Sequence, residues 1–220
     1  MGERPIRPKV SSGRSPTNSW GRVPRWNRFL VIIPGLTLAL LLGGCERAEK
    51  APEFALTNIT GASFGKELNL PDHNGKMRSL ADFRGKVVAL FFGFTHCPDA
   101  CPTTLVELAQ VMRELGPDAY QVQVLFVTVD PERDTPAVLQ QYVPSFHPEF
   151  LGLRGDAEAT ARVAKEFKVF YQKQPLKDGY SVDHSAGTYF FDREGRLRLF
   201  APYGKGGAAM LHDIRILLAS

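Results

Sequence analysis

Two nearly unbroken apolar runs limit the folds that are open to this chain. KVVALFFGF at 86–94 and VQVLFVTVD at 122–130 each have the length of one strand. Continuous apolar character is expected of strands that are buried on both faces of a sheet. Between them, TTLVELAQVMREL at 103–115 has apolar residues at helical spacing and ends before Gly116 and Pro117. The chain therefore contains a strand, a helix and a strand in sequence, which predicts an α/β fold.

The rest of the chain extends this order. We expect two further helices, a β-hairpin and a terminal helix, at 135–146, 156–169, 187–201 and 206–220. Strand, helix, strand and helix followed by a hairpin and a helix is the order of a thioredoxin-like fold. Asn74-Gly75, a dipeptide typical of tight turns, predicts an additional N-terminal β-hairpin. The predicted fold class is therefore α/β and thioredoxin-like, with that hairpin added.

Residues 1–44 form a leader with its own composition. They carry seven of the 27 basic residues and one of the 23 acidic ones. An apolar stretch from Phe29 to Leu42 follows the basic part, and it contains Pro34. The stretch is shorter than the roughly 20 residues that a transmembrane helix needs. This pattern is typical of a secretory signal peptide, with an uncleaved N-terminal anchor as the alternative.

The end of the leader, Leu42-Gly43-Gly44-Cys45, resembles a bacterial lipobox, in which cleavage exposes a cysteine that is then lipidated. We therefore expect a signal peptide with lipobox at 1–44, a lipid on Cys45, a tether at 45–56 and the folded domain at 57–220. These features place the protein in a bacterial cell envelope, on the periplasmic face. The lipid anchor would hold it to a membrane there.

The charge of the folded part excludes one class of partner. The whole chain has a formal net charge of +4, but the leader supplies the basic excess. Residues 45–220 alone have a formal net charge of −2. Because nucleic-acid binding needs a basic surface, we expect no nucleic acid partner.

The stretch FTHCPDACPTT at 94–104 follows the first buried strand and contains two of the three cysteines. If Cys97 and Cys101 share a helical turn, their sulfurs lie on one face, which allows either a disulfide or a two-thiolate metal site. The backbone N–H groups at a helix start favour thiolate and so support both uses. Two buried structural thiols are the third alternative, which Pro98 and Pro102 disfavour because they restrict the backbone around the pair.

The five histidines supply candidate nitrogen ligands. We expect three of them to be surface or structural residues: His73, His147 and His212. His96 adjoins Cys97 and can tune its environment. His184 lies before a predicted strand, next to Asp183, which could orient its imidazole as an outer-shell partner. From the residues alone, a histidine in this place is more often structural than a ligand, whereas two thiolates with an imidazole would suit Cu(I) or Cu(II).

Three separate motifs change this balance. FFGFTHCPDACPTTL, FVTVDPERDTP and VDHSAGTYFFDREGRLRLF together resemble the Sco/SenC family of copper-binding proteins, over roughly residues 52–220. The resemblance implies a thioredoxin-like fold and copper ligands at Cys97, Cys101 and His184. It also implies a role in the assembly of the dinuclear copper centre of cytochrome c oxidase. Asp130 matches an acidic residue near the family site, and a local cap beside Pro131 explains it equally well.

The resemblance implies a copper metallochaperone that delivers Cu(I) or Cu(II) to cytochrome c oxidase subunit II, with another periplasmic copper chaperone as a further partner. The alternative is a thiol–disulfide oxidoreductase, in which Cys97 and Cys101 form a redox pair that reduces the recipient's cysteines. Copper or redox sensing is compatible with the same site. Whether the protein is an enzyme stays open at this stage.

Overall fold

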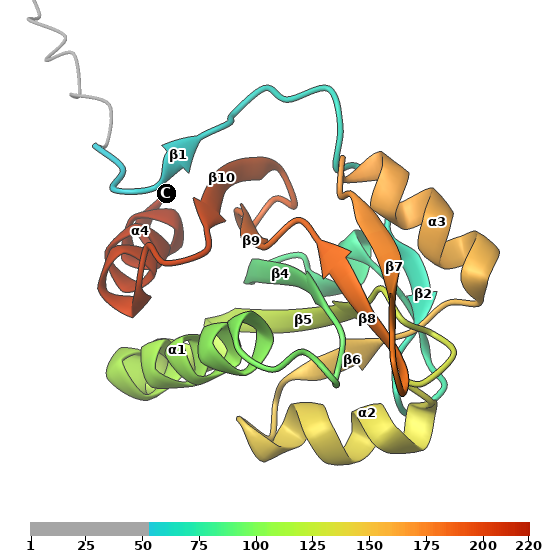
Figure 1. The fold of residues 1–220 in the computed structure, drawn as a ribbon. Coiled ribbons are helices and arrows are strands. Elements are labelled where there is room, and N and C mark those ends of the chain that lie inside the picture. The colour runs from blue at the N-terminus through green and yellow to red at the C-terminus, as the bar shows by residue number, and fades with distance from the viewer. Residues whose placement is uncertain (1–52) are drawn as a thin grey trace, which may run out of the picture. The chain divides into compact units, whose positions relative to one another are not determined.

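The computed structural model describes residues 53–220 (Figure 1). The expected signal peptide at 1–44, the lipidation of Cys45 and the tether residues up to 52 lie outside the described residues. Within 53–220, no helix is both long and apolar enough to cross a bilayer.

A six-stranded sheet forms the centre of the fold, in the order β1-β10-β9-β4-β5-β6. Its strands are β1 Thr57–Asn58, β4 Val87–Gly93, β5 Val122–Thr128, β6 Leu151–Leu153, β9 Gly187–Phe191 and β10 Leu197–Pro202. Strands β4, β5 and β6 are parallel, whereas β9, β10 and β1 are joined by antiparallel pairing. Every residue of β4 and β5 is buried. The two apolar runs are therefore the central strands, as their composition predicts.

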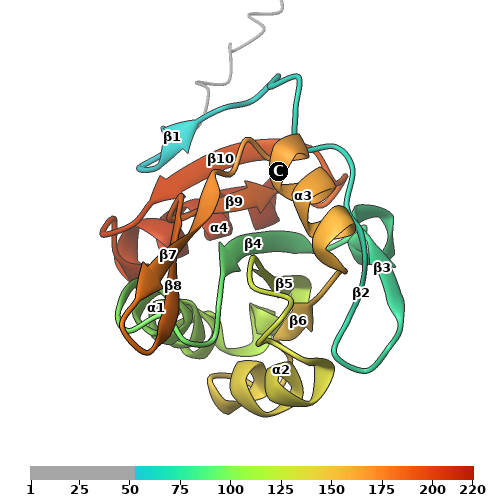
Figure 2. The same cartoon turned by 45° about the vertical axis from the view of Figure 1, so that its right-hand side comes forward.

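Within residues 53–220, four α-helices pack around this sheet: α1 Ala100–Leu115, α2 Pro136–Tyr142, α3 Ala157–Glu166 and α4 Gly207–Ala219. Helices α1 and α4 lie side by side in both views (Figures 1 and 2). Asp156 caps α3 by accepting a 2.7 Å hydrogen bond from the Ala159 N–H. Helix α2 is shorter than expected because Pro144 follows it, and the chain continues as a 3-10 turn at Val143–Ser145. Two other 3-10 turns lie at Leu80–Phe83 and Gly116–Gln121.

Two hairpins lie outside the central sheet. Strands β2 Asn69–Pro71 and β3 Met77–Ser79 form the expected N-terminal hairpin, whose turn contains Gly75 at φ +82°. Strands β7 Tyr171–Leu176 and β8 Gly179–His184 pair only with each other. The sequence did not predict this second hairpin, because most of its side chains are exposed and it lacks the alternating apolar pattern of a half-buried strand. The fold is the predicted α/β thioredoxin-like arrangement with an added N-terminal hairpin.

The strand pairing brings distant segments to one edge of the sheet. Strand β4 ends at Gly93, and the loop to α1 follows it. Because β9 runs antiparallel to β4, with Thr188 opposite Phe91, the start of β9 lies at the edge where β4 ends. The end of the β7–β8 hairpin immediately precedes β9. His184 is therefore carried to the loop that contains both cysteines.

Candidate metal centre

Three side chains converge at this edge of the sheet. The sulfurs of Cys97 and Cys101 and a ring nitrogen of His184 all lie within 4.8 Å of one another. The distance between Cys101 Sγ and His184 Nε2 is 3.6 Å, although 83 positions separate the two residues. Among residues 53–220, this is the one group of three or more potential metal ligands that lie so close together.

The cysteine loop, residues 94–101, differs in one respect from the expected helical turn. Helix α1 begins at Ala100, so Cys97 precedes the helix and Cys101 lies in its first turn. The Cys101 N–H donates to Cys97 Sγ at 3.4 Å. The two sulfurs still meet, because the chain turns back at Pro98 and Asp99 before the helix starts. Both cysteines are free thiols.

Gly93 allows the close packing of Cys101. A Cβ atom at Gly93 would lie 2.9 Å from Cys101 Sγ and 2.8 Å from the Phe126 ring. Both distances are shorter than real Cβ contacts, so the position requires a residue without a side chain. Cys101 is fully buried as a result. The sequence contained only a glycine inside a strand run as a signal for this close approach.

Asp134 fixes the other end of the cysteine loop, and sequence reasoning missed it. Its buried carboxylate accepts hydrogen bonds from the Thr95 N–H at 3.0 Å and from the hydroxyls of Thr95 and Thr128 at 2.5 Å each. Burial raises the pKa of Asp134, while the Thr128 and Thr95 donors oppose that shift. The carboxyl group thus ties the loop to the end of β5.

The two thiols differ in their electrostatics. A hydrogen bond from the Cys101 thiol, with further help from the Asp99 and Cys101 N–H groups, lowers the pKa of Cys97 to about 5 against burial. The same contact with Cys97, together with burial, raises the pKa of Cys101. At neutral pH the metal-free pair therefore shares one proton, with the thiolate at the half-exposed Cys97.

His184 is oriented through its own neighbour. Its Nδ1 lies 3.0 Å from the carbonyl oxygen of Ser185. Since a carbonyl only accepts, Nδ1 carries a proton, and Nε2 is the ring nitrogen that faces the Cys101 sulfur and is placed to bind a metal ion. The edges of the Phe91 and Phe94 rings pack around the imidazole, at centroid distances of 6.4 and 5.7 Å.

The two acidic residues expected near the site lie apart from the sulfurs. Asp183 is exposed, and its carboxylate makes no hydrogen bond among the described residues. The Ser185 carbonyl, rather than Asp183, therefore orients the His184 imidazole. Asp130 is fully buried and accepts a 2.8 Å hydrogen bond from the Tyr180 hydroxyl, as well as one from Arg133 Nε. Asp130 is thus more than a local cap, because it contacts the hairpin that carries His184.

The remaining histidines lie elsewhere. His96 is exposed and its Nδ1 lies 3.1 Å from the Thr95 hydroxyl. His212 is mostly exposed, beside Asp213. His73 was expected at the surface but is buried. Its Nδ1 accepts a hydrogen bond from the Gly152 N–H at 3.1 Å, which satisfies the buried ring nitrogen. Of the histidines within 53–220, His184 is thus the one that reaches the thiols.

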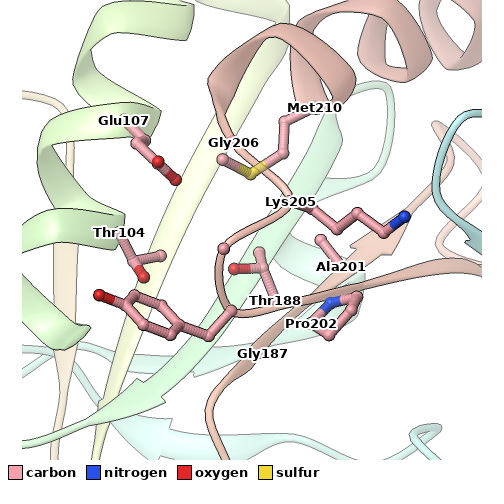
Figure 3. Close-up of a pocket in the computed structure, with 11 residues that line it drawn as sticks. Thr104, Glu107, Gly187, Thr188, Ala201, Pro202, Lys205, Gly206 and Met210 are labelled. Carbon is pink, nitrogen blue, oxygen red and sulfur yellow. The ribbon is translucent and has the colours of Figure 1, made fainter.

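An open cleft of about 470 Å³ gives access to the site, with Cys97, Pro98, Asp183 and His184 among its lining residues. A second cavity, between α1, the start of α4 and the β9–β10 pair, is lined by residues that include Thr188 and Glu107 (Figure 3). Its volume of about 10 Å³ has room for about one water molecule. The cleft at Cys97 and His184 is thus much the larger of these two openings.

The donor set fits a soft metal ion. Bonds of about 2.0–2.3 Å place the ligands of one ion up to about 4.6 Å apart, close to the separations among these three atoms. Two thiolates with one imidazole favour ions such as Cu(I). In the absence of an ion, the same sulfurs are close enough for thiol–disulfide chemistry.

The chain has clear relatives among characterised proteins. It is 48% identical to "Protein SCO2 homolog, mitochondrial" of Bos taurus over 141 residues, which cover 62% of this chain and 52% of the cattle protein. It is 41% identical to the protein of the same name from Mus musculus over 191 residues, covering 84% of this chain and 75% of the mouse protein. The chain thus spans about half to three quarters of these relatives.

These relatives correct the expected location. The cattle, mouse, human and yeast proteins are all mitochondrial by name. They point to mitochondria, so the prediction of a bacterial cell envelope is wrong. The error has a physical origin: a basic leader with few acidic residues is typical both of secretory signals and of mitochondrial targeting sequences.

Solved structures and a family model agree with the relatives. Bradyrhizobium japonicum ScoI with copper bound is 41% identical, with a TM-score of 0.65 and coverage of 71% of this chain and 100% of that one. Yeast Sco1 with copper bound is 33% identical, with a TM-score of 0.66 and coverage of 72% and 90%. The family model described as SCO1/SenC matches residues 56–219. This chain belongs to the SCO1/SenC family.

Proposed function

We propose that this chain binds copper as a cargo through the thiolates of Cys97 and Cys101 and the imidazole of His184, and delivers it for the assembly of cytochrome c oxidase. The specific recipient is the dinuclear copper centre of subunit II. The observation that carries the proposal is the convergence of two sulfurs and one ring nitrogen within 4.8 Å. The copper-bound structures of the Bradyrhizobium and yeast family members support it.

The geometry suits a carrier that must also release its cargo. Cys101 is fully buried, whereas Cys97 and His184 are half-exposed and line the open cleft. A recipient's thiolates can therefore approach from the side of Cys97 and His184 and replace these ligands one at a time. When copper leaves, Cys101 takes up a proton because its pKa is raised, and its hydrogen bond then stabilises the Cys97 thiolate.

An anaerobic copper titration of the reduced protein tests this proposal. We expect one copper per chain and sulfur-to-copper charge-transfer absorption from the Cu(II) form. His184→Ala should lose stable copper binding while it keeps a reversible Cys97–Cys101 disulfide. His212→Ala, which changes an exposed histidine on α4, is the matched control and should bind as the parent does. Parent-like binding by His184→Ala would show that the ligand assignment is wrong.

The asymmetry of the thiols favours thiol–disulfide exchange as a second candidate. The Cys97 thiolate would attack a disulfide of the recipient, forming a mixed disulfide and releasing one recipient thiolate. Cys101, losing its proton, would then attack Cys97 Sγ and release the second thiolate. Two electrons pass to the recipient, and a Cys97–Cys101 disulfide remains.

The reduction of an oxidised dithiol peptide by His184→Ala separates the two candidates. Copper delivery requires the imidazole, whereas disulfide exchange uses only the sulfurs. Parent-like reduction rates in this variant, without oxidase maturation, would assign the essential function to copper. Maturation that continues in Cys97→Ser/Cys101→Ser would contradict both candidates.

A further inference from the structure

The hairpin that carries His184 has little support of its own. The histidine hairpin, residues 171–184, pairs with no strand of the central sheet. Val182 is its one buried residue, and the others are half-buried or exposed. An isolated two-stranded hairpin is marginally stable in water. Contacts from outside the hairpin must therefore fix the position of His184.

Arg133, in the loop that follows β5, makes two of these contacts, both to Tyr180. Its Nη1 donates a 2.8 Å hydrogen bond to the carbonyl oxygen of Tyr180. Its guanidinium lies 3.9 Å from the centre of the Tyr180 ring and 5.8 Å from that of Phe94. Phe94 also packs its ring against His184. A single side chain thus contacts both the hairpin and an aromatic ring that lies against the imidazole.

Asp130 connects Arg133 to the buried sheet. Its carboxylate accepts from Arg133 Nε and, at 2.8 Å, from the Tyr180 hydroxyl. The Asp130 N–H donates to the Thr128 hydroxyl at 3.0 Å, at the end of β5. The side chain of Asp130 is fully buried, so these charge-assisted bonds are shielded from solvent. By contrast, the nearby pair of Lys173 and Glu132 is exposed and contributes little.

We propose that Arg133 is the positioning residue for His184: together with Asp130 and Tyr180 it attaches the histidine hairpin to the end of β5 and so places the imidazole at the cysteine sulfurs. The inference rests on the proposed function, in which His184 is a copper ligand. Arg133 makes no hydrogen bond to the two sulfurs or to the His184 ring nitrogen, so it acts on them through the hairpin. Its removal should therefore affect copper through His184 and leave the thiols intact.

The chain contains a closely matched control for the ion pair itself. Arg78 donates from Nε to the fully buried side chain of Asp72 at 2.8 Å, and its guanidinium lies 5.7 Å from the Phe83 ring. The exposed fraction of its side chain is 20%, against 24% for Arg133. This pair belongs to the β2–β3 hairpin, which carries no metal ligand. Arg78→Met therefore reproduces the loss of a pair with a buried aspartate but leaves His184 alone.

A double-mutant cycle on the full chain tests the coupling. Competition with a chromophoric Cu(I) chelator gives the affinities of the parent, Arg133→Met, His184→Ala and the double variant. We expect Arg133→Met to weaken copper binding by about 10- to 100-fold, the range for residues that orient a ligand. In the His184→Ala background it should cause no further loss, and Arg78→Met should match the parent. Arg133→Lys keeps a positive charge for Asp130 but lacks the planar guanidinium, so its copper affinity should lie between those of the parent and Arg133→Met. It replaces Arg133→Met in the test if the methionine variant does not fold.

A metal-free readout completes the test. In Arg133→Met, the amides of residues 171–184 should exchange hydrogen faster, and the His184 ring protons should lose the shifts caused by Phe91 and Phe94. Arg78→Met should change neither. If Arg133→Met weakens binding equally in both backgrounds, or binds as the parent does, the positioning role is overturned. If His184→Ala itself binds as the parent does, the failure lies in the proposed ligand set instead.

Discussion

The cysteine loop and the histidine hairpin supply the residues of the proposed metal centre but are attached to the protein in different ways. The cysteine loop follows a fully buried strand, packs against Gly93 and is tied down by the buried carboxylate of Asp134. The histidine hairpin lies outside the central sheet and depends on polar contacts around Arg133. Cys101 is thus part of the core and Cys97 packs against it, whereas His184 is carried by a hairpin outside the central sheet.

This difference suits transfer of a metal ion. In the proposed function, the buried Cys101 would hold copper at a fixed place, while the imidazole on a separately attached hairpin would leave and return. Local opening needs less free energy where few apolar groups are buried, as in residues 171–184. The comparison predicts that substitutions beneath the cysteine loop affect global stability, whereas those beneath the hairpin affect copper affinity.

The largest effect on stability is expected from Asp134→Ala. It leaves the Thr95 N–H and the Thr128 hydroxyl without their acceptor in a buried place, and we expect a loss of about 3 kcal/mol in the free energy of unfolding. Denaturant unfolding of the metal-free protein measures it. Asp156→Ala, which removes the exposed cap of α3, should cost only about 1 kcal/mol. Equal losses in the two variants would mean that Asp134 has no special part in holding the cysteine loop.

A smaller loss is expected from Gly93→Ala. The added methyl group would overlap Cys101 Sγ and the Phe126 ring, and overpacking of this kind costs about 2 kcal/mol. Because Cys101 must shift, copper affinity should fall as well. Gly207→Ala is the control, since its nearest contact would be at an ordinary 3.5 Å. Calorimetric melting of both variants checks the difference, and an unchanged melting temperature in Gly93→Ala would contradict the close packing.

The same contrast explains how far the sequence could predict this molecule. The central strands and the first helix follow from apolar runs, because burial on both faces leaves a strong pattern. The pair of Cys97 and Cys101 is visible from its spacing. The histidine hairpin leaves no such pattern, since its position depends on Arg133 and Asp130 rather than on apolar burial.

The ligand role of His184 and the anchoring roles of Gly93 and Asp134 depend on long-range contacts. His184 was identified by family resemblance, because no local pattern brings a histidine to sulfurs 83 positions away. Asp134 looks like a residue at a helix start until the strand pairing places Thr95 beside it. The buried His73 likewise receives its hydrogen bond from the Gly152 N–H, 79 positions further along the chain. Contacts of this kind depend on which strands pair in the fold, and sequence spacing alone does not predict that pairing.

The last prediction concerns the cysteine loop itself, where Cys97 is half-exposed and Cys101 is buried. With a pKa of about 5, Cys97 is thiolate throughout the neutral range, so its alkylation rate in the copper-free protein should be nearly constant from pH 6 to 8. An ordinary thiol, with a pKa of about 8.5, would react almost tenfold faster per pH unit there. Cys101→Ala removes the main hydrogen bond to the thiolate and should restore part of that slope. A steep rise in the parent would show that Cys101 does not stabilise the Cys97 thiolate.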